Sequence, residues 1–495
     1  MGNTRMRAIA LASLLAAGTF LFAAPAAAPS TGSTSHKVLA NGLEVFAVEN
    51  RAVPLVTICV AFRGGASAQT RETAGLFHLY EHMLFKANAK YPNQASFVAA
   101  LNRMGVANWN GSTGDESIKY YITIPSDKLE EGVEFWSWAV KSPTLDPAEL
   151  ESEKEVVINE IRGYHSDPDQ IMYNALESRA FPAAPWRKNI DGPEENIRGA
   201  TVERLKAMRD EFYIPRNAAV FIGGDASPER AFAAVEKHFG DWKGGRAPAI
   251  GEPPQGPVPA GLALVYPDPD YYDGVALAQL LWRGPDALRE TRDTYATDVL
   301  LFLLSSPVGA FKKALMTKGP GLYDPKYIDF SYPTARDGGE ISLSAFLRVQ
   351  DPAAEGPVLD RAEALREVAL AEFAAIAADP AAYFGAAELE KAKAKLVDQN
   401  ILAAEVAGRF VSGTLAFWWS VATADYYFDY EKNCGAVSWA DVASLARRRL
   451  LEAPSAIALR LNAEAYAADP AMGERIKKLG YRAVTDGDAF WWQQE

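Results

Sequence analysis

The most informative segment of this chain is Gly75-Leu76-Phe77-His78-Leu79-Tyr80-Glu81-His82-Met83-Leu84-Phe85. It is mostly apolar and contains no proline, which predicts a buried helix. Residues three and four positions apart share one face of a helix, so His78, Glu81 and His82 should converge. Two imidazoles at this spacing suit a tetrahedral zinc ion, and the free carboxylate of Glu81 can take a proton from a metal-bound water.

Two core histidines that happen to lie close together are the alternative interpretation. The chain has only five histidines, which makes a chance pair around a glutamate a poor explanation. An unpaired buried charge at Glu81 would also be costly. We therefore expect one zinc ion per chain, held on a helix with the inverted order His-x-x-Glu-His.

The segment from Glu151 to Ile161 offers candidates for a third zinc ligand. Glu153 and Glu160 are seven residues apart and would lie on one stripe of a helix. Glu155 is out of phase with both, so we expect it to be solvated. Apolar residues surround Glu160, which predicts that its side chain faces the interior and needs a charge partner.

The zinc helix resembles that of the pitrilysin/insulinase metallopeptidase family, which includes the mitochondrial processing peptidases. Glu81-His82-Met83-Leu84-Phe85-Lys86 and Lys90-Tyr91-Pro92 match the family pattern, and matching motifs extend over residues 36–240. The resemblance implies that Glu160 is the third ligand and that Glu153 supports a histidine from behind the metal. A plain surface carboxylate is the alternative for Glu153.

Asn110-Gly111-Ser112-Thr113 resembles the Asn-Ala-x-Thr edge strand of that family, to which a peptide substrate adds as an extra strand. An exposed edge offers unpaired backbone groups to any extended peptide. The resemblance implies that Asn110 binds substrate, although a polar loop without a role is the alternative. Gly111 replaces the usual alanine.

The second half of the chain departs from the family at one position. Active relatives carry an arginine and a tyrosine, seven residues apart, that bind the substrate carbonyl. Tyr323 matches the tyrosine, but Met316 occupies the arginine position and cannot donate a hydrogen bond. Lys318 could substitute as a point charge. We therefore expect the zinc-bearing member of a heterodimer, whose homologous partner supplies an Arg/Tyr pair, with a homodimer or monomer as the alternative.

The order of elements predicts an α+β fold made of two internally duplicated α/β-sandwich domains. Asn41-Gly42 predicts a type I′ hairpin turn between two short strands. Strands are expected at 55–62 and 120–124, and helices at 96–104 and 127–140. Family resemblance implies that the two domains form half of a clamshell.

A Pro/Gly-rich linker, residues 246–261, separates an expected catalytic domain at 36–245 from a C-terminal domain at 262–490. The second domain contains no histidine and so has no metal site of this kind. Two aromatic clusters lie in it, Phe417-Trp418-Trp419 and Phe490-Trp491-Trp492, and core packing is the expected use of both.

Residues 1–26 have the pattern of a secretory signal: Arg5 and Arg7, then an apolar run, then small residues. We therefore expect an exported protein, periplasmic or secreted, without stable membrane insertion. The formal net charge of −13 argues against a nucleic-acid partner. Cys59 is expected in a buried strand; whether it pairs with Cys434 cannot be read from the sequence.

These observations together predict a zinc endopeptidase that cleaves short or unfolded peptides. One alternative is a catalytically weak relative that acts as a structural or peptide-binding subunit, and the other is a different zinc hydrolase such as an amidase. The remaining histidines, His36, His165 and His238, are expected to be solvated or to cap helices.

Overall fold

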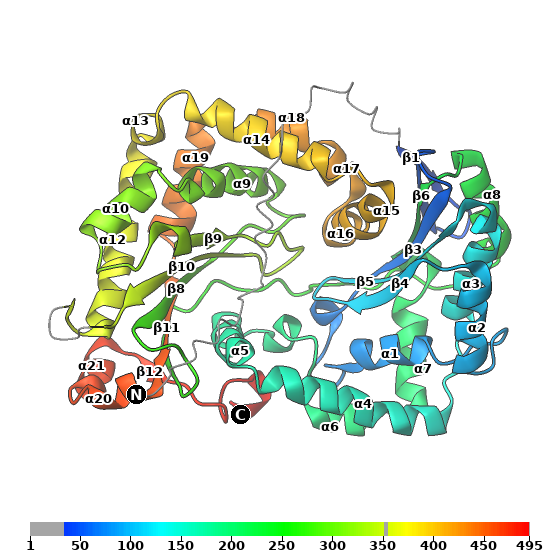
Figure 1. The fold of residues 1–495 in the computed structure, drawn as a ribbon, viewed down its shortest axis with the longest axis horizontal. Helices are drawn as coiled ribbons and strands as arrows, with labels where there is room; N and C mark the ends of the chain where they lie inside the picture. The colour runs from blue at the N-terminus through cyan, green and yellow to red at the C-terminus, as the bar shows by residue number, and fades with distance from the viewer. Residues whose placement is uncertain (1–33, 351–354, 495) are drawn as a thin grey trace, which may run out of the picture.

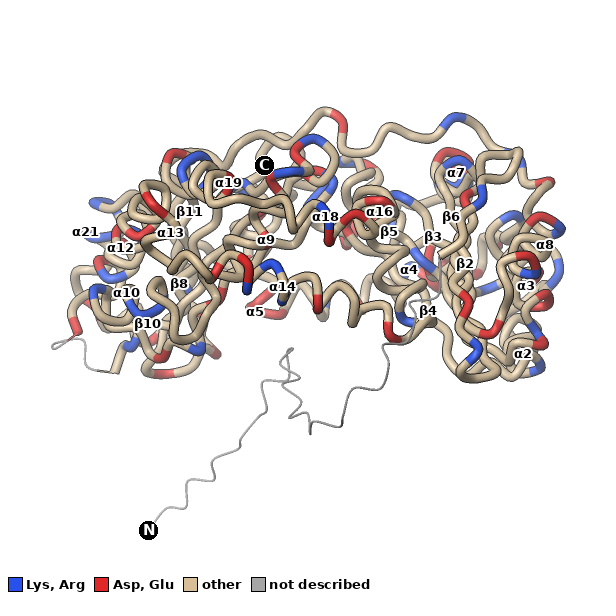
Figure 2. The backbone as a smooth tube through the Cα atoms, turned by 90° about the horizontal axis from the view of Figure 1, so that it is seen from above, with Lys and Arg blue, Asp and Glu red and all other residues tan. Residues whose placement is uncertain are grey.

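The structure, a computed structural model, describes residues 34–350 and 355–494. Two halves lie side by side, each with a six-stranded sheet flanked by helices (Figure 1). Seen from above, α5 (Pro168–Ala180) and α14 (Glu388–Leu402) lie between the halves, and acidic and basic residues are interspersed around the outside (Figure 2). The expected signal sequence lies outside the described residues.

The first sheet has the strand order β1-β2-β6-β3-β5-β4. The neighbours β2 and β6 are parallel and the other pairs are antiparallel. Because β3 and β6 are central and covered on both faces, they read as continuous apolar runs. The strand bounds are β1 Thr34–Val38, β2 Glu44–Glu49, β3 Leu55–Arg63, β4 Asn108–Thr113, β5 Ser117–Pro125 and β6 Ala218–Gly224.

The predicted hairpin forms between β1 and β2, but its turn is not the expected two-residue type I′ turn. The backbone N–H of Leu39 donates to the carbonyl of Leu43, which leaves a three-residue loop, and Gly42 has φ 91°. A type I turn followed by a left-handed glycine is the usual form of such a loop. The Asn41 amide explains the difference, because it donates to the carbonyls of Phe239 and Trp242 and so anchors the longer loop.

Helices cover one face of the first sheet and provide its hydrophobic core. Leu79 of α1, Trp136 of α3 and Val157 of α4 are fully buried there. The helices of this half are α1 Leu76–Leu84, α2 Gln94–Met104, α3 Leu129–Lys141, α4 Pro147–His165, α6 Glu194–Arg198, α7 Val202–Phe212 and α8 Pro228–Phe239.

The second sheet repeats the order of the first, as β12-β7-β11-β8-β10-β9. The five strands β7-β11-β8-β10-β9 occupy the same positions as β2-β6-β3-β5-β4 in the first sheet, which confirms the predicted internal duplication. The outer edge differs, because β12 comes from the C-terminal segment and runs parallel to β7. The strand bounds are β7 Ala263–Asp268, β8 Val275–Arg283, β9 Asp329–Ser331, β10 Glu340–Arg348, β11 Ser455–Asn462 and β12 Arg482–Ala483.

A second hydrophobic core lies between this sheet and its own helices. Fully buried side chains from α9, α12 and β10 meet there, among them Leu300, Phe373 and Leu343. The principal helices are α9 Thr291–Ser305, α10 Ala310–Lys318, α12 Val358–Ala378, α18 Tyr430–Gly435 and α19 Trp439–Leu445.

Each half also supplies a helix to the other half's sheet. Helix α5 packs through Ile171 and Leu176 against strands of the second sheet. The helical segment 407–421, whose last part is α16 (Ala416–Val421), covers the free face of the first sheet, where Trp419 is 1% exposed and meets Phe221. Core packing is therefore confirmed for Trp419, and the two expected domain ranges are tied together by exchanged helices.

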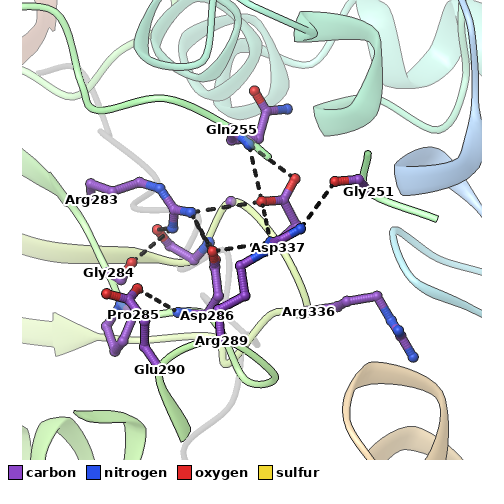
Figure 3. A network of polar contacts seen from close by, with 12 residues as sticks. Gly251, Gln255, Arg283, Gly284, Pro285, Asp286, Arg289, Glu290, Arg336 and Asp337 are labelled. Carbon is purple, nitrogen blue, oxygen red and sulfur yellow. Dashed lines mark hydrogen bonds and ion pairs between the residues drawn. The ribbon is translucent and has the colours of Figure 1, made fainter. Parts of the chain in front are cut away.

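Residues 246–261 form neither helix nor strand, but several polar contacts hold them. The Asp337 carboxylate accepts a hydrogen bond from the backbone N–H of Gln255 (Figure 3). Arg289 pairs with both Asp337 and Glu252. Arg187, from the first half, donates to the carbonyls of Glu252 and Pro253. The segment is thus fixed to both halves.

Cys59 and Cys434 are both free and fully buried. Burial raises the pKa of the Cys59 thiol to about 12, so it behaves as a small core side chain, as expected. Within the described residues no single helix has the length and apolar composition to cross a membrane, and two sharply bent helix pairs meet those two criteria together.

Candidate metal centre

Helix α1 presents one polar stripe on an otherwise buried surface. Leu76, Leu79 and Met83 are fully buried, whereas the His78 and His82 side chains are 13% and 21% exposed. The helix starts at Gly75, which has φ 91° and whose absent Cβ would lie 2.3 Å from the carbonyl oxygen of Asp191. The apolar faces thus fix α1 in the core and leave its histidines facing α4.

His78, His82 and Glu160 form the one group of three potential ligands that converges among the described residues. Their ligand atoms all lie within 4.8 Å of one another. His82 Nε2 is 3.5 Å from Glu160 Oε2, and His78 Nε2 is 3.9 Å from Glu160 Oε1. Ligand atoms bound at ~2.1 Å to a tetrahedral zinc ion lie about 3.4 Å apart. The residues therefore fit a zinc ion with only small side-chain adjustments.

Electrostatics at this site favour ligation. Burial, reinforced by the neighbouring His82, lowers the pKa of His78 to about 4, so its imidazole is neutral at pH 7. Only a neutral imidazole nitrogen has the lone pair that a metal needs. Nitrogen and carboxylate donors in this number are typical of a zinc site that keeps one position open.

Glu81 lies beside the ligand cluster but is not one of its members. Burial raises the pKa of its carboxyl group, although a hydrogen bond opposes that effect: Thr113 Oγ1 donates to Glu81 Oε2 over 2.5 Å. A carboxyl group with a raised pKa is suited to both accepting and returning a proton. No role was assigned to Thr113 from the sequence, although it matches the threonine of the Asn-Ala-x-Thr pattern on the expected edge strand.

Glu153 lies behind His82, where its Oε1 is 2.8 Å from His82 Nδ1. Its Oε2 pairs with Lys86 Nζ at 2.6 Å. Burial would raise the pKa of Glu153, but the hydrogen bonds from His82 and Lys86 outweigh burial and hold it below its usual value. This contact fits the supporting role that the family resemblance implies.

The expected burial was wrong for one of the α4 glutamates, Glu160. Glu153 is 5% exposed and not a surface carboxylate, whereas the Glu160 side chain is 38% exposed and does not face the interior. The core side of α4 is set by Leu150, Val157 and Ile161, and Glu160 lies at its flank, towards α1. Glu155 is solvated, as expected, and pairs with Arg198.

Strand β4 is the exposed edge of the first sheet, next to α1. Asn110 is exposed on it, which is compatible with binding an extended peptide. The Gly111 backbone also lies close to the site, because a Cβ there would be 3.0 Å from Glu81 Oε1 and 2.7 Å from the Phe85 ring. The glycine therefore brings the backbone edge against the proposed base.

In the second half the Tyr323 side chain is exposed, and the position expected to hold an arginine is occupied by Met316. Tyr323 is 45% exposed, whereas Met316 packs against the second core. Lys318 Nζ is paired with Glu372 at 2.7 Å, so it is not a free replacement cation. Two guanidinium groups lie beside Gly321, two residues before Tyr323: that of Arg361, which binds loop carbonyls, and that of Arg348, whose side chain is 47% exposed.

The remaining histidines are only partly as expected. His36 is half exposed and pairs with Glu44. His165 was expected in a solvated loop, but it ends α4 with its side chain 17% exposed, and its ring lies tilted against Phe490 with the ring centroids 4.4 Å apart. Contact with the C-terminal aromatic cluster, which the sequence did not reveal, explains this burial.

A duplicated α/β-sandwich fold with an inverted His-x-x-Glu-His helix defines a class of metallopeptidases. Within that class the chain belongs to peptidase family M16. Residues 45–194 match the model described as Insulinase (Peptidase family M16), and residues 199–396 match that described as Peptidase M16 inactive domain.

Curated relatives resemble part of the chain. The mitochondrial-processing peptidase subunit beta of Dictyostelium discoideum is 26% identical over 210 residues, which are 42% of this chain and 44% of that protein. The zinc protease PqqE of Helicobacter pylori is 28% identical over 248 residues, 48% of this chain and 54% of that protein. The chain thus matches about half the length of these relatives.

Solved structures share the fold over most of the chain. A protease from Helicobacter pylori has a TM-score of 0.71 at 21% identity and covers 87% of this chain and 99% of its own. The first half of the periplasmic protease PqqL from Escherichia coli has a TM-score of 0.68 at 17% identity and covers 93% of this chain and 99% of its own.

Proposed function

We propose that this chain is a zinc-dependent endopeptidase that hydrolyses short or unfolded peptides. The main support is the convergence of His78, His82 and Glu160, whose ligand atoms lie within 4.8 Å of one another. Glu81 adjoins them and β4 offers an exposed edge beside them. Membership of family M16 agrees with this function, and the chain retains the three proposed ligands and Glu81.

A zinc ion held there would supply Lewis-acid chemistry, since it lowers the pKa of a water molecule and polarises a peptide carbonyl. The edge of β4 would bind the substrate as an added strand, with Asn110 contacting its backbone. Glu81 would accept a proton from the attacking water and return it to the leaving amine. Thr113 would hold one oxygen of Glu81 in place for both transfers.

We further propose that the active form contains a homologous partner subunit. Met316 is partly buried against the second core and Lys318 is paired with Glu372, so the donor expected beside Tyr323 is missing from its place. Losing one such donor typically costs about 10²–10³ in rate. A partner supplying an Arg/Tyr pair would restore it, and a homodimer is the alternative. One relative is named as a subunit, which agrees with this proposal.

The N-terminal pattern supports a further proposal, that the protein is exported to the periplasm or beyond. Arg5 and Arg7 followed by an apolar run resemble a secretory signal. One similar solved structure is titled a periplasmic protease, which is compatible with export. Fractionation of expressing cells would test it.

The test is a digest of unfolded peptides by the purified chain, alone and with co-expressed homologues, with and without a chelator. The proposal predicts internal cleavage that the chelator abolishes and added zinc restores. Cleavage unaffected by the chelator would refute the role of the metal. Hydrolysis of simple amides but not of peptides would favour the amidase, and zinc binding without hydrolysis under every condition would favour a non-catalytic subunit.

A further inference from the structure

The carboxylate of Asp191 lies between two buried histidine nitrogens that have no hydrogen-bond partner. Its Oδ1 is 4.0 Å from His78 Nδ1, and its Oδ2 is 3.9 Å from His165 Nε2. Both nitrogens are buried and unbonded. Orphaned polar atoms of this kind are uncommon in folded proteins and call for an explanation.

The loop that carries Asp191 is built against the start of α1. A Cβ on Gly192, whose φ is +65°, would lie 2.4 Å from the backbone of Ala74. The Gln69 side chain bridges the two segments, accepting from the Gly75 N–H at 2.8 Å and donating to the Asn189 carbonyl at 2.9 Å. These contacts hold the backbone on both sides of Asp191 against the start of α1.

Each of the two histidines has Glu160 on its Nε2 side and another carboxylate on its Nδ1 side. His82 already has Glu153 at its Nδ1, while Nε2 faces Glu160. For His78, Nε2 also faces Glu160, and the nearest carboxylate to Nδ1 belongs to Asp191. Metal-bound histidines almost always donate their second N–H to a carboxylate, carbonyl or water, which fixes the tautomer and the ring orientation.

We propose that Asp191 is the positioning residue for His78, and that His165 holds Asp191 from the other side. This inference rests on the proposed zinc site. In the zinc-bound protein the 4.0 Å and 3.9 Å separations would close to hydrogen-bond length. Asp191 Oδ1 would then accept the Nδ1–H of His78, which leaves the lone pair on Nε2 for the metal, and His165 would donate its Nε2–H to Oδ2. Since the His165 ring lies 4.4 Å from Phe490 and 5.3 Å from Trp492, the C-terminal segment buttresses the metal site.

The experiment measures the zinc dissociation constant of the purified chain by competition with a chromophoric chelator. Asp191→Ala should weaken zinc binding by about 10–100-fold, the usual effect of removing such a partner. Asp191→Asn keeps an acceptor oxygen and should bind zinc with an intermediate affinity. Glu155→Ala is the matched control, because it removes an exposed carboxylate from α4, and it should bind zinc as tightly as wild type does.

His165→Phe separates hydrogen bonding from packing, because it keeps a ring packed against Phe490 but loses the N–H. It should weaken zinc binding several-fold while the metal-free protein melts at the wild-type temperature. The visible absorption spectrum of the cobalt-substituted Asp191→Ala variant should also differ from that of wild type, since ring orientation alters the ligand field.

Wild-type affinity in both Asp191→Ala and Asp191→Asn, with an unchanged cobalt spectrum, would overturn the inference. If Asp191→Ala fails to fold, the Asp191→Asn and His165→Phe variants decide the question in the same way. Failure of the proposed zinc site looks different, because wild-type protein itself would then bind no zinc, and failure of hydrolysis alone would leave the zinc affinities of all these variants as predicted.

Discussion

Chemistry at the residue scale depends on how the polar stripe of α1 is surrounded. Burial holds His78 neutral and raises the pKa of Glu81, and the two effects together prepare a ligand and a proton acceptor. Thr113 and Glu153 then fix the orientation of Glu81 and His82. Each neighbour therefore has a separate, testable role.

Glu81→Gln should retain zinc but lose activity, because the base does not ligate the metal. General acid–base catalysis typically contributes 10²–10⁴-fold, so a fall of about that size in kcat is expected. Zinc content by elemental analysis and peptide turnover are the two measurements. His82→Ala is the contrasting variant and should lose the metal; near-normal turnover of Glu81→Gln would contradict the proposed mechanism.

Glu160→Gln should weaken zinc binding strongly, since a neutral amide is a poor replacement for a carboxylate ligand. Glu155→Gln lies on the same helix, is exposed, and should change nothing. Chelator competition on both variants measures the difference. Equal zinc affinity in the two would remove Glu160 from the ligand set.

Spacing along one helix was enough to predict that His78, Glu81 and His82 share a face. Spacing was not enough to predict which glutamate of α4 is buried. The buried face of that helix depends on the elements that pack against it. Asp191 and Thr113 come from a distant loop and an edge strand, and no local pattern connects them to α1. Contacts of this kind are set by tertiary structure alone.

At the scale of elements, the approach of β4 to α1 links substrate binding to catalysis. Gly111→Val should lower kcat by about 10²-fold, because a misplacement of ~1 Å at the reacting groups can cost that much. A Cβ at Gly111 already meets Phe85 and Glu81 Oε1. Kinetics and zinc content measure the effect, and Ser112→Val, which adds the same branched side chain at the next, exposed position of β4, is the control. An unchanged kcat in Gly111→Val would contradict the prediction, because it would show that the Phe85 ring can move aside without displacing Glu81.

Helix α9 contains a carboxyl group whose titration should affect stability. Burial raises the pKa of Asp298 to about 7, although the Tyr430 hydroxyl donates a hydrogen bond to it. The folded state therefore favours the protonated form: this contribution is complete below pH 4 and is lost as pH rises through 7. Asp298→Asn removes the titration, and its free energy of unfolding relative to wild type should improve by about 4 kcal/mol between pH 4 and pH 8. Denaturant melts across that range would contradict this if the difference stayed constant.

The strand order of the whole molecule repeats from one half to the other, and the sequence pattern was sufficient to predict that duplication. The exchange of α5 and the segment 407–421 between halves was not predictable, because their apolar faces do not reveal which sheet they cover. The same limit applies to the hairpin loop, whose length is set by Asn41 reaching carbonyls at residues 239 and 242. The periodicity of the sequence predicts where helices and strands lie, but which of them pack together depends on long-range contacts.

The central claim is that His78, His82 and Glu160 hold one zinc ion with a position left open for water. X-ray absorption at the zinc edge of the purified, zinc-loaded chain tests it most directly. The claim predicts one zinc per chain with two nitrogen and at least two oxygen neighbours at about 2.0–2.2 Å, and loss of that signal in His82→Ala. A sulfur neighbour at about 2.3 Å, or an unchanged spectrum in His82→Ala, would contradict it.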